Sequence, residues 1–280
     1  MKEERFDLTY NDEPGRVIRG RVTWPSANSV TGTWALLLHG FKGHMDWGFF
    51  PLLARGLAEC GVTVVRFNTS GSGVGADMEY YSDPVGFERD TYSRQLEDIA
   101  RVREAITSGQ LGELDAERGV LIGHSRGGGM GLIHASEHAY QGVVTWASIC
   151  DPIFFGEKTI ALWREQGYID VPNTRTGQLM RIGFDAVRDV DENAQRLDIL
   201  AAAGRIEAPV LVLHGSGDDS VPVACAHQIA ERLPNGEVHV LEGAGHTFGA
   251  AHPLTSVEPD LAQVLAMTAE FTLQCLGLEM

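Results

Sequence analysis

The sequence predicts an α/β fold built on a doubly wound, mostly parallel sheet, and two observations support this prediction. Short apolar runs alternate along the chain with longer segments in which apolar residues recur every three or four positions, as on one face of a helix. In the clearest of these segments the apolar positions form one stripe: Tyr92, Leu96, Ile99, Val102 and Ile106. Strands that alternate with helices imply parallel crossover connections.

The individual elements follow in chain order. An early antiparallel strand is predicted at Val17–Trp24, where apolar and polar residues alternate before a turn region containing Pro, Ser, Asn and Gly. Strand and helix pairs are then predicted at Trp34–His39 with Phe50–Cys60, Val62–Phe67 with Phe87–Thr107, and Gly119–Ile122 with Gly127–Glu137. Strand-like runs resume at Val143–Ala147, Val210–His214 and Val238–Leu241, and a final helix is predicted at Asp260–Leu276.

Between residues 151 and 207 the alternation stops. The segment mixes aromatic residues, a Pro-Asn-Thr-Arg-Thr-Gly loop and a charged, helix-like stretch at Phe184–Ala203. An unstructured connection of this length is unusual inside a compact domain. We therefore expect a core formed by residues 1–150 and 208–280, with a small inserted cap at 151–207, and the alternative is an irregular crossover. The aromatic residues of this segment either line a substrate pocket or fill the cap's own core: Phe154, Phe155, Trp163 and Tyr168.

Composition and charge exclude several classes of protein. With 280 residues, 44% hydrophobic and 21% charged, the chain has ordinary globular composition. Its net charge of −16 disfavours binding to nucleic acid or to anionic membranes, both of which need clustered Lys and Arg. No apolar run approaches the length of about 18 residues that a membrane span needs, and the N-terminus lacks the apolar part of a signal peptide. The expected compartment is the cytoplasm and the expected partner a small molecule, while the sequence leaves a homodimer open.

The cysteines and histidines predict neither a disulfide framework nor a metal site. The four cysteines, Cys60, Cys150, Cys225 and Cys275, are widely scattered and lack C-x-x-C spacing, so they are predicted to be reduced, mostly buried thiols. The ten histidines lack metal-ligand spacing such as H-E-x-x-H. We expect no metal and no cofactor.

One glycine-rich stretch imitates a nucleotide-binding motif. Residues 71–76, Gly-Ser-Gly-Val-Gly-Ala, match the dinucleotide fingerprint G-x-G-x-x-G/A after a predicted strand. A cofactor loop of that type opens directly into a helix, whereas this one leads into acidic residues and Pro84. We therefore expect a flexible loop at the rim of the site.

The strongest chemical signal is Gly123-His124-Ser125-Arg126-Gly127, which joins a predicted strand to a predicted helix. This is the G-x-S-x-G pattern in its required strand–turn–helix setting. The sharp turn needs glycines because side chains there would collide with the adjoining strand and helix. It also places Ser125 at a helix N-terminus, where free N–H groups favour a developing negative charge. Ser125 is therefore the predicted nucleophile.

A serine hydroxyl needs a histidine base, and that base needs an acid to orient it. Both follow in chain order, Asp218 after the strand at 210–213 and His246 after the strand at 238–241. Each lies just beyond the carboxyl end of a strand, where sites form in open α/β sheets.

With these motifs the chain resembles the α/β-hydrolases over about residues 34–271, most closely the dienelactone-hydrolase-like and cinnamoyl or feruloyl esterase branches. The resemblance implies Ser125 as nucleophile, Asp218 as acid in an H-G-x-x-D-x-x-V-P pattern, and His246 as base. Asp219 is the competing acid, since a shift of one residue in the loop exchanges the two. Three further histidines abut strand ends and are interpreted as positional or structural: His39, His124 and His214.

The resemblance also implies an oxyanion hole formed by the backbone N–H groups of Phe41 and Arg126. The charge of Arg126 departs from the Gln or Met of many relatives, and its side chain is expected to pair with a cap carboxylate or to meet an acidic substrate group. The predicted activity is that of a serine carboxylesterase that hydrolyses a small acyl or hydroxycinnamoyl-like ester through an acyl-enzyme. A thioesterase, a dienelactone-type lactonase or a peptidase with the same triad is the alternative, and a ligand-binding protein on the same fold is the non-enzymatic one.

Overall fold

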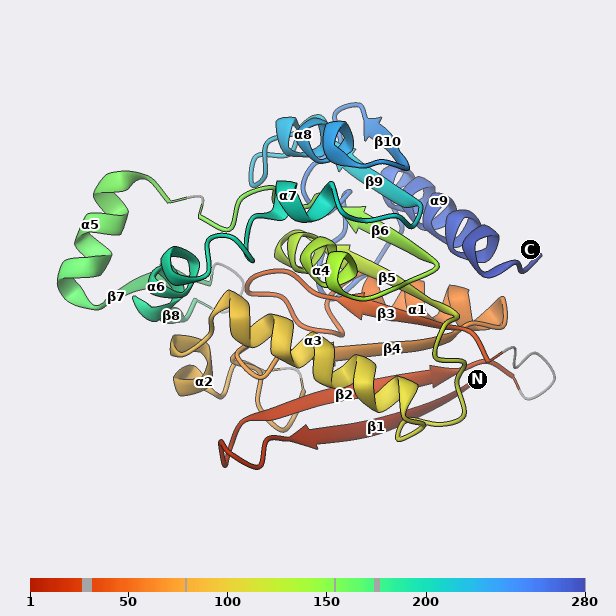
Figure 1. The fold of residues 1–280 in the computed structure, drawn as a ribbon, viewed down its shortest axis with the longest axis horizontal. Coiled ribbons are helices and arrows are strands. Elements are labelled where there is room, and N and C mark those ends of the chain that lie inside the picture. The colour runs from red at the N-terminus through yellow and green to blue at the C-terminus, as the bar shows by residue number, and fades with distance from the viewer. Residues whose placement is uncertain (27–31, 79, 154, 174–176, 280) are drawn as a thin grey trace.

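The computed structural model describes residues 1–26, 32–78, 80–153, 155–173 and 177–279. Within these residues an eight-stranded sheet has the order β1-β2-β4-β3-β5-β6-β9-β10 (Figure 1). Its strands are β1 (Lys2–Thr9), β2 (Val17–Trp24), β3 (Trp34–Leu38), β4 (Thr63–Asn68), β5 (Gly119–His124), β6 (Gly142–Trp146), β9 (Val210–Gly215) and β10 (Gly236–Leu241). In this sheet, neighbouring strands along β4-β3-β5-β6-β9-β10 pair in parallel, whereas β2 pairs antiparallel with both β1 and β4. The predicted fold class is confirmed.

Helices cover both faces of the sheet, because successive residues of a buried strand point to opposite sides. Ala35 and Leu37 of β3 pack on the side of α1 (Phe50–Glu59) and α9 (Pro259–Leu276). Leu36 and Leu38 pack on the other side. That side is covered by α3 (Tyr92–Thr107), α4 (Arg126–Glu137), α7 (Ile199–Ala203) and α8 (Ala224–Arg232). The central strands therefore appear in the sequence as continuous apolar runs.

The segment between β6 and β9 begins with a small group of elements beside the sheet (Figure 1). The group contains α5 (Glu157–Gln166), the antiparallel pair β7 (Tyr168–Pro172) and β8 (Leu179–Gly183), and α6 (Asp185–Glu192), and α7 follows it. Apolar residues of α5, β7, β8 and α6 pack with Phe87 of α2 (Pro84–Glu88) in a cluster of their own. Ile199 and Ala202 of α7 instead join the main core. The helix-like stretch predicted at Phe184–Ala203 is thus two helices that pack against different parts of the molecule.

Two further elements lacked a sequence signal, and one predicted helix is divided. The edge strand β1 is mostly exposed and begins with charged residues, so it shows no apolar run. α8 was not predicted either. The helix predicted at Phe87–Thr107 is interrupted at Asp90, and Thr91 caps α3 by accepting a hydrogen bond from the N–H of Arg94. Among the described residues, no helix is long and apolar enough to cross a membrane.

Candidate active site

Ser125 lies in the sharp turn between β5 and α4. Its backbone has φ 57° and ψ −120°, a conformation that L-residues rarely adopt and that is retained only when the surroundings enforce it. The neighbouring glycines explain how the chain turns so tightly. A Cβ at Gly123 would lie 2.3 Å from the carbonyl oxygen of Gly127, and a Cβ at Gly127 would lie 2.5 Å from that of Leu38. The close approach of strand and helix therefore requires glycine at both positions.

The structure brings Ser125, His246 and Asp218 into one hydrogen-bonded chain. The distance from Ser125 Oγ to His246 Nε2 is 3.1 Å, and that from His246 Nδ1 to Asp218 Oδ2 is 2.8 Å. When Nδ1 carries the proton and donates a hydrogen bond to the Asp218 carboxylate, Nε2 has no proton. It can then accept a hydrogen bond from the serine hydroxyl. This arrangement can activate the hydroxyl as a nucleophile.

Asp218 is built to remain ionised. Its side chain is fully buried, and Oδ1 accepts hydrogen bonds from the backbone N–H groups of Ser220 and Val221, each at 2.9 Å. Burial alone would raise the pKa of this carboxyl, but hydrogen bonds from His214, His246 and Val221 outweigh it and hold the pKa well below its usual range. The competitor Asp219 is exposed, and its carboxylate accepts a hydrogen bond from the hydroxyl of Ser220. The structure thus brings Asp218, and not Asp219, to His246.

Three other histidines surround the site. His214 Nε2 lies 3.3 Å from Asp218 Oδ2 and 3.0 Å from the carbonyl oxygen of Val221, so it contacts the acid directly. Sequence reasoning did not predict this contact, although the H-G-x-x-D spacing was its signal. His124 Nε2 lies 3.0 Å from the carbonyl oxygen of His246. The Nε2 atom of His39 accepts a hydrogen bond from the backbone N–H of Thr69.

Burial keeps two of these rings neutral. It lowers the pKa of His124 to about 3, with the nearby His246 acting in the same direction. It lowers that of His39 to about 4, because burial outweighs the hydrogen bond to the carbonyl of Gly40. Both rings therefore serve to hold loops in place.

Phe41 follows β3 and Arg126 begins α4, and both line the cavity that contains Ser125. The side chain of Arg126 is buried and donates to Asp90 at 3.1 Å. Asp90 lies between α2 and α3, so the expected partner on the cap is wrong: the carboxylate belongs to the segment that follows β4. Burial raises the pKa of Asp90 to about 7, although Arg126 and Gln95 oppose the rise.

A cavity of about 840 Å³ opens over Ser125 and His246. One wall is formed by the loops that carry the residues above, and the other by the segment after β6: Asp151, Ile153, Phe155, Val171 and Pro172. Of the aromatic residues predicted as pocket candidates, Phe155 lines the cavity. Trp163 is buried in the cluster beside α2, and Tyr168 packs under Arg181. Phe154 lies outside the described residues. The described part of the chain holds no group of three or more His, Cys, Asp or Glu side chains arranged to bind a metal ion.

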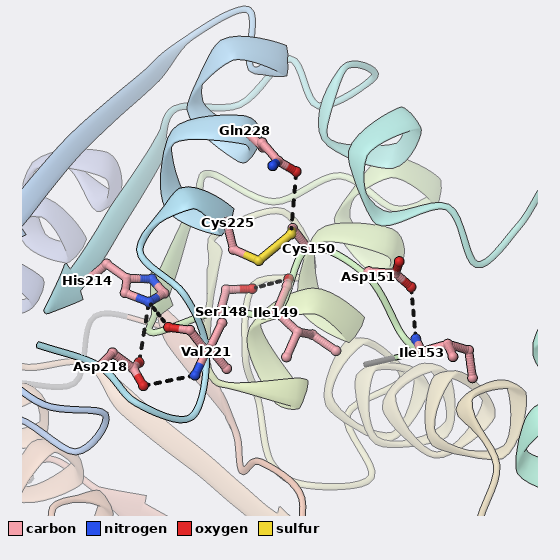
Figure 2. The surroundings of a disulfide bond; sticks show 10 residues. All are labelled: Ser148, Ile149, Cys150, Asp151, Ile153, His214, Asp218, Val221, Cys225 and Gln228. Carbon is pink, nitrogen blue, oxygen red and sulfur yellow. Dashed lines mark hydrogen bonds and ion pairs between the residues drawn. A yellow bond between two sulfur atoms is a disulfide. The ribbon is translucent and has the colours of Figure 1, made fainter. Parts of the chain in front are cut away.

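A disulfide joins Cys150 to Cys225 at the edge of this cavity (Figure 2). The prediction that all four cysteines are reduced and mostly buried is therefore wrong, since only Cys60 and Cys275 are free and both are half-buried. Residues 75 positions apart meet because β6 and β9 are neighbours in the sheet, and spacing along the chain cannot reveal that. The bridge ties the loop after β6 to the start of α8, just after the Asp218 loop.

Comparison with known proteins shows the family. A family model described as the prolyl oligopeptidase family matches residues 47–279. The non-heme chloroperoxidase of Streptomyces lividans is 28% identical over 214 residues, which cover 63% of this chain and 73% of that protein. The uncharacterized peptidase YuxL of Bacillus subtilis is 27% identical over 261 residues, covering 86% of this chain. The chain spans 36% of the length of YuxL.

Solved structures show the same fold. Est1E from Butyrivibrio proteoclasticus with bound ferulic acid aligns with a TM-score of 0.74 and 19% identity, and the alignment covers 96% of this chain and 100% of the Est1E chain. A putative hydrolase from Agrobacterium vitis aligns with a TM-score of 0.74 and 21% identity, covering 99% and 100%. The resemblance to α/β-hydrolases is confirmed. Because the family model spans most of the chain, including Ser125, Asp218 and His246, the chain belongs to the prolyl oligopeptidase family, within the α/β-hydrolase superfamily of serine hydrolases.

Proposed function

We propose that this chain is a serine carboxylesterase that cleaves small acyl or hydroxycinnamoyl-like esters through an acyl-enzyme on Ser125. The observation that carries the proposal is the chain of hydrogen bonds from Asp218 through His246 to Ser125, at 2.8 and 3.1 Å, beside a cavity of about 840 Å³. In the first step His246 takes the proton of Ser125, and Oγ attacks the ester carbonyl carbon. The resulting oxyanion accepts hydrogen bonds from the backbone N–H groups of Phe41 and Arg126.

The same residues complete the reaction. When the tetrahedral intermediate collapses, His246 returns its proton to the leaving alkoxide, and the acyl group remains on Ser125. His246 then deprotonates a water molecule that attacks the acyl-enzyme, which releases the acid. Asp218 stays ionised throughout, because its hydrogen bonds favour the carboxylate, and it stabilises the imidazolium form of His246.

The cavity wall supports an acyl or aromatic substrate. Most of the residues contributed by the segment after β6 are apolar, among them Ile153, Phe155 and Val171. A solved relative of the same fold, Est1E, holds ferulic acid. We propose that residues 151–207 act as an inserted cap, and that this cap selects the acyl group.

Peptide bond hydrolysis is the second candidate, because the matching family is the prolyl oligopeptidase family and one relative is named a peptidase. The triad does not distinguish the two, since both reactions pass through an acyl-enzyme. Turnover of methyl ferulate, short p-nitrophenyl esters, acyl-CoA thioesters and aminoacyl p-nitroanilides distinguishes the classes. We expect the esters to be cleaved with the highest kcat/KM.

The test of the nucleophile is Ser125→Ala, measured by hydrolysis of p-nitrophenyl acetate. We expect kcat to fall by about 10⁴-fold or more while the protein remains folded. Labelling by a p-nitrophenyl phosphonate, followed by mass spectrometry, should disappear in the same variant. The control is Ser136→Ala on α4, the helix that follows Ser125; the Ser136 hydroxyl donates to the carbonyl of Ile133. Unchanged hydrolysis in Ser125→Ala would refute the proposed function.

A further inference from the structure

The side chain of Arg126 is enclosed by aromatic rings from two other parts of the fold. Its guanidinium carbon lies 4.3 Å from the centre of the Phe41 ring and 4.7 Å from that of Tyr92. Phe41 belongs to the loop after β3, and Tyr92 begins α3. Each contact is within the range of a cation–π interaction. The residue that follows the nucleophile thus holds together three segments around the cavity.

A buried carboxylate anchors this guanidinium. Arg126 Nη1 lies 3.1 Å from Asp90 Oδ2, and the two side chains are 8% and 7% exposed. Gln95 Nε2 donates to the same carboxylate oxygen at 2.6 Å. Burying two charges is costly, and apolar residues often stabilise a core as well as a buried ion pair does. A role beyond stability is therefore worth testing.

Gly71, the first residue of the glycine-rich loop at 71–76, packs against Asp90. A Cβ at Gly71 would lie 2.3 Å from Asp90 Oδ1, so glycine is what allows the loop to cover the carboxylate. Among the described residues, Oδ1 has no hydrogen-bond partner. Asp90 therefore directs its hydrogen bonding toward Gln95 and Arg126. The first glycine of the motif that imitates a nucleotide site thus packs against this ion pair.

The loop that carries Phe41 depends on such side-chain contacts. Gly40 packs directly on the nucleophile, because a Cβ there would lie 2.9 Å from that of Ser125. Lys42 has a positive φ of 55°, which marks a sharp turn. Between them, the ring of Phe41 packs against Phe87, with 5.7 Å between ring centres, and against Arg126. Because the ring is held on two sides, it limits how far the backbone of Phe41 can move.

We propose that the Asp90–Arg126 pair positions the oxyanion hole: Arg126, anchored by Asp90, holds the ring of Phe41 and so fixes the Phe41 N–H relative to the N–H of Arg126. This inference rests on the proposed function. Binding of an acidic substrate group by Arg126 is disfavoured, because Asp90 already pairs with the guanidinium and two rings cover it. Arg126 is then a positioning residue through its side chain, in addition to donating its backbone N–H.

Two variants test the proposal while keeping both backbone donors. Asp90→Asn preserves shape and removes the anchoring charge, and Phe41→Leu removes the ring that Arg126 holds. Loss of one oxyanion donor costs about 10²–10³ in rate, so we expect its misplacement to lower kcat/KM for p-nitrophenyl acetate by about ten- to a hundredfold. If Asp90→Asn does not fold, Phe41→Leu carries the test.

The readout that a merely structural role would not move is binding of a trifluoromethyl ketone. Such a ketone adds to the serine hydroxyl, and the hydroxyl proton passes to His246, so that an oxyanion forms at the carbonyl oxygen. Its inhibition constant should rise by the same factor as kcat/KM falls, because both depend on the oxyanion hole. The methyl ketone of the same shape binds as the neutral ketone and should change by less than about twofold.

The matched control is Glu137→Gln at the end of α4. Glu137 pairs with Arg196 at 2.8 and 2.9 Å and is not among the residues that line the cavity. It should cost some stability without changing kcat/KM or trifluoromethyl ketone binding. An equal loss in Glu137→Gln would overturn the inference, as would wild-type inhibition in Asp90→Asn and Phe41→Leu. The inference would also fail if Arg126→Met raised KM only for an ester with a carboxylate in its acyl group. Each of these results leaves the Ser125→Ala test untouched, so the inference and the proposed function fail separately.

Discussion

The two walls of the cavity are built in different ways. One wall comes from the loops after β3, β5, β9 and β10, at the carboxyl ends of parallel strands. Backbone groups hold its residues. The carboxylate of Asp218 accepts hydrogen bonds from two backbone N–H groups of its own loop, and Ser125 is held by a tight turn between glycines. The other wall comes from the segment after β6, where side chains from loops and from β7 face the cavity.

The difference separates chemistry from selectivity. Backbone-held residues must have particular types at fixed spacings, because a turn admits only certain residues and a carboxylate must meet particular N–H groups. Apolar side chains on the second wall can exchange with others of similar size at small cost. We therefore expect changes in the first wall to abolish the reaction, and changes in the second to alter only which esters react.

Among the changes that compare the two walls, the largest effect is expected for Asp218→Asn, which removes the carboxylate that holds the His246 proton on Nδ1. An amide in this place can favour the wrong tautomer, and we expect kcat to fall by about 10³–10⁴-fold. Asp219→Asn is the matched control, because its exposed carboxylate lies one residue further along the same loop. It should keep kcat within about threefold. Steady-state hydrolysis of p-nitrophenyl acetate measures both variants. A greater loss of kcat in Asp219→Asn would show that Asp219, and not Asp218, is the acid of the triad.

The first wall could be predicted from the sequence because its signals are local. The central strands are continuous apolar runs in the sequence, and the G-x-S-x-G pattern predicts the sharp turn at Ser125. The acid and the base each follow a predicted strand. The Asp90–Arg126 pair had no such signal, since 36 residues separate its members and no sequence motif contains both. β1 was missed because an edge strand that faces water needs no apolar run.

The second largest effect tests how the second wall is attached to the core. The Cys150–Cys225 bridge closes a loop that contains the whole segment 151–207. Closure of a loop of 75 residues restricts the unfolded chain by about 4 kcal/mol in the entropic account, and measured values for disulfides are typically about 2–4 kcal/mol. Cys150→Ser/Cys225→Ser should lower the free energy of unfolding by this amount in urea, while kcat for p-nitrophenyl acetate stays within about twofold.

The control for the disulfide is Cys60→Ser, which replaces a free, half-buried thiol on the far side of the sheet from α8. Treatment of the wild type with a dithiol should reproduce the double variant. Identical urea midpoints with and without the dithiol would show that the bridge does not stabilise the fold. The failed cysteine prediction has the same cause as the missed ion pair: the partners meet only after the sheet has assembled.

A pH-dependent effect concerns the neutral histidines that hold the first wall. Because burial lowers the pKa of His39 to about 4 in the folded protein, the unfolded chain binds more protons between that value and 6.5. Stability from this group is therefore present above about pH 6.5 and lost as the pH falls toward 4, at no more than about 1.4 kcal/mol per pH unit.

His39→Gln should flatten this part of the stability profile, measured by urea unfolding between pH 7 and pH 4. The glutamine amide keeps a donor for the carbonyl of Gly40 and cannot titrate. His227→Gln is the control, since His227 is exposed on α8. A profile in His39→Gln as steep as that of the wild type would mean that other groups cause the acid destabilisation.

The smallest effect is expected on the second wall, and it is the one that bears on the substrate. Phe155 lines the cavity and packs edge-on against Trp163, so Phe155→Ala should remove apolar contact with a large acyl group. We expect kcat/KM for methyl ferulate to fall by about three- to tenfold, about 1 kcal/mol, and that for p-nitrophenyl acetate to change by less than about twofold. Tyr168→Ala is the matched control, because this ring packs with Arg181 instead of lining the cavity. An equal loss on both esters would mean that Phe155 supports the first wall, and the division between chemistry and selectivity would then not coincide with the two walls.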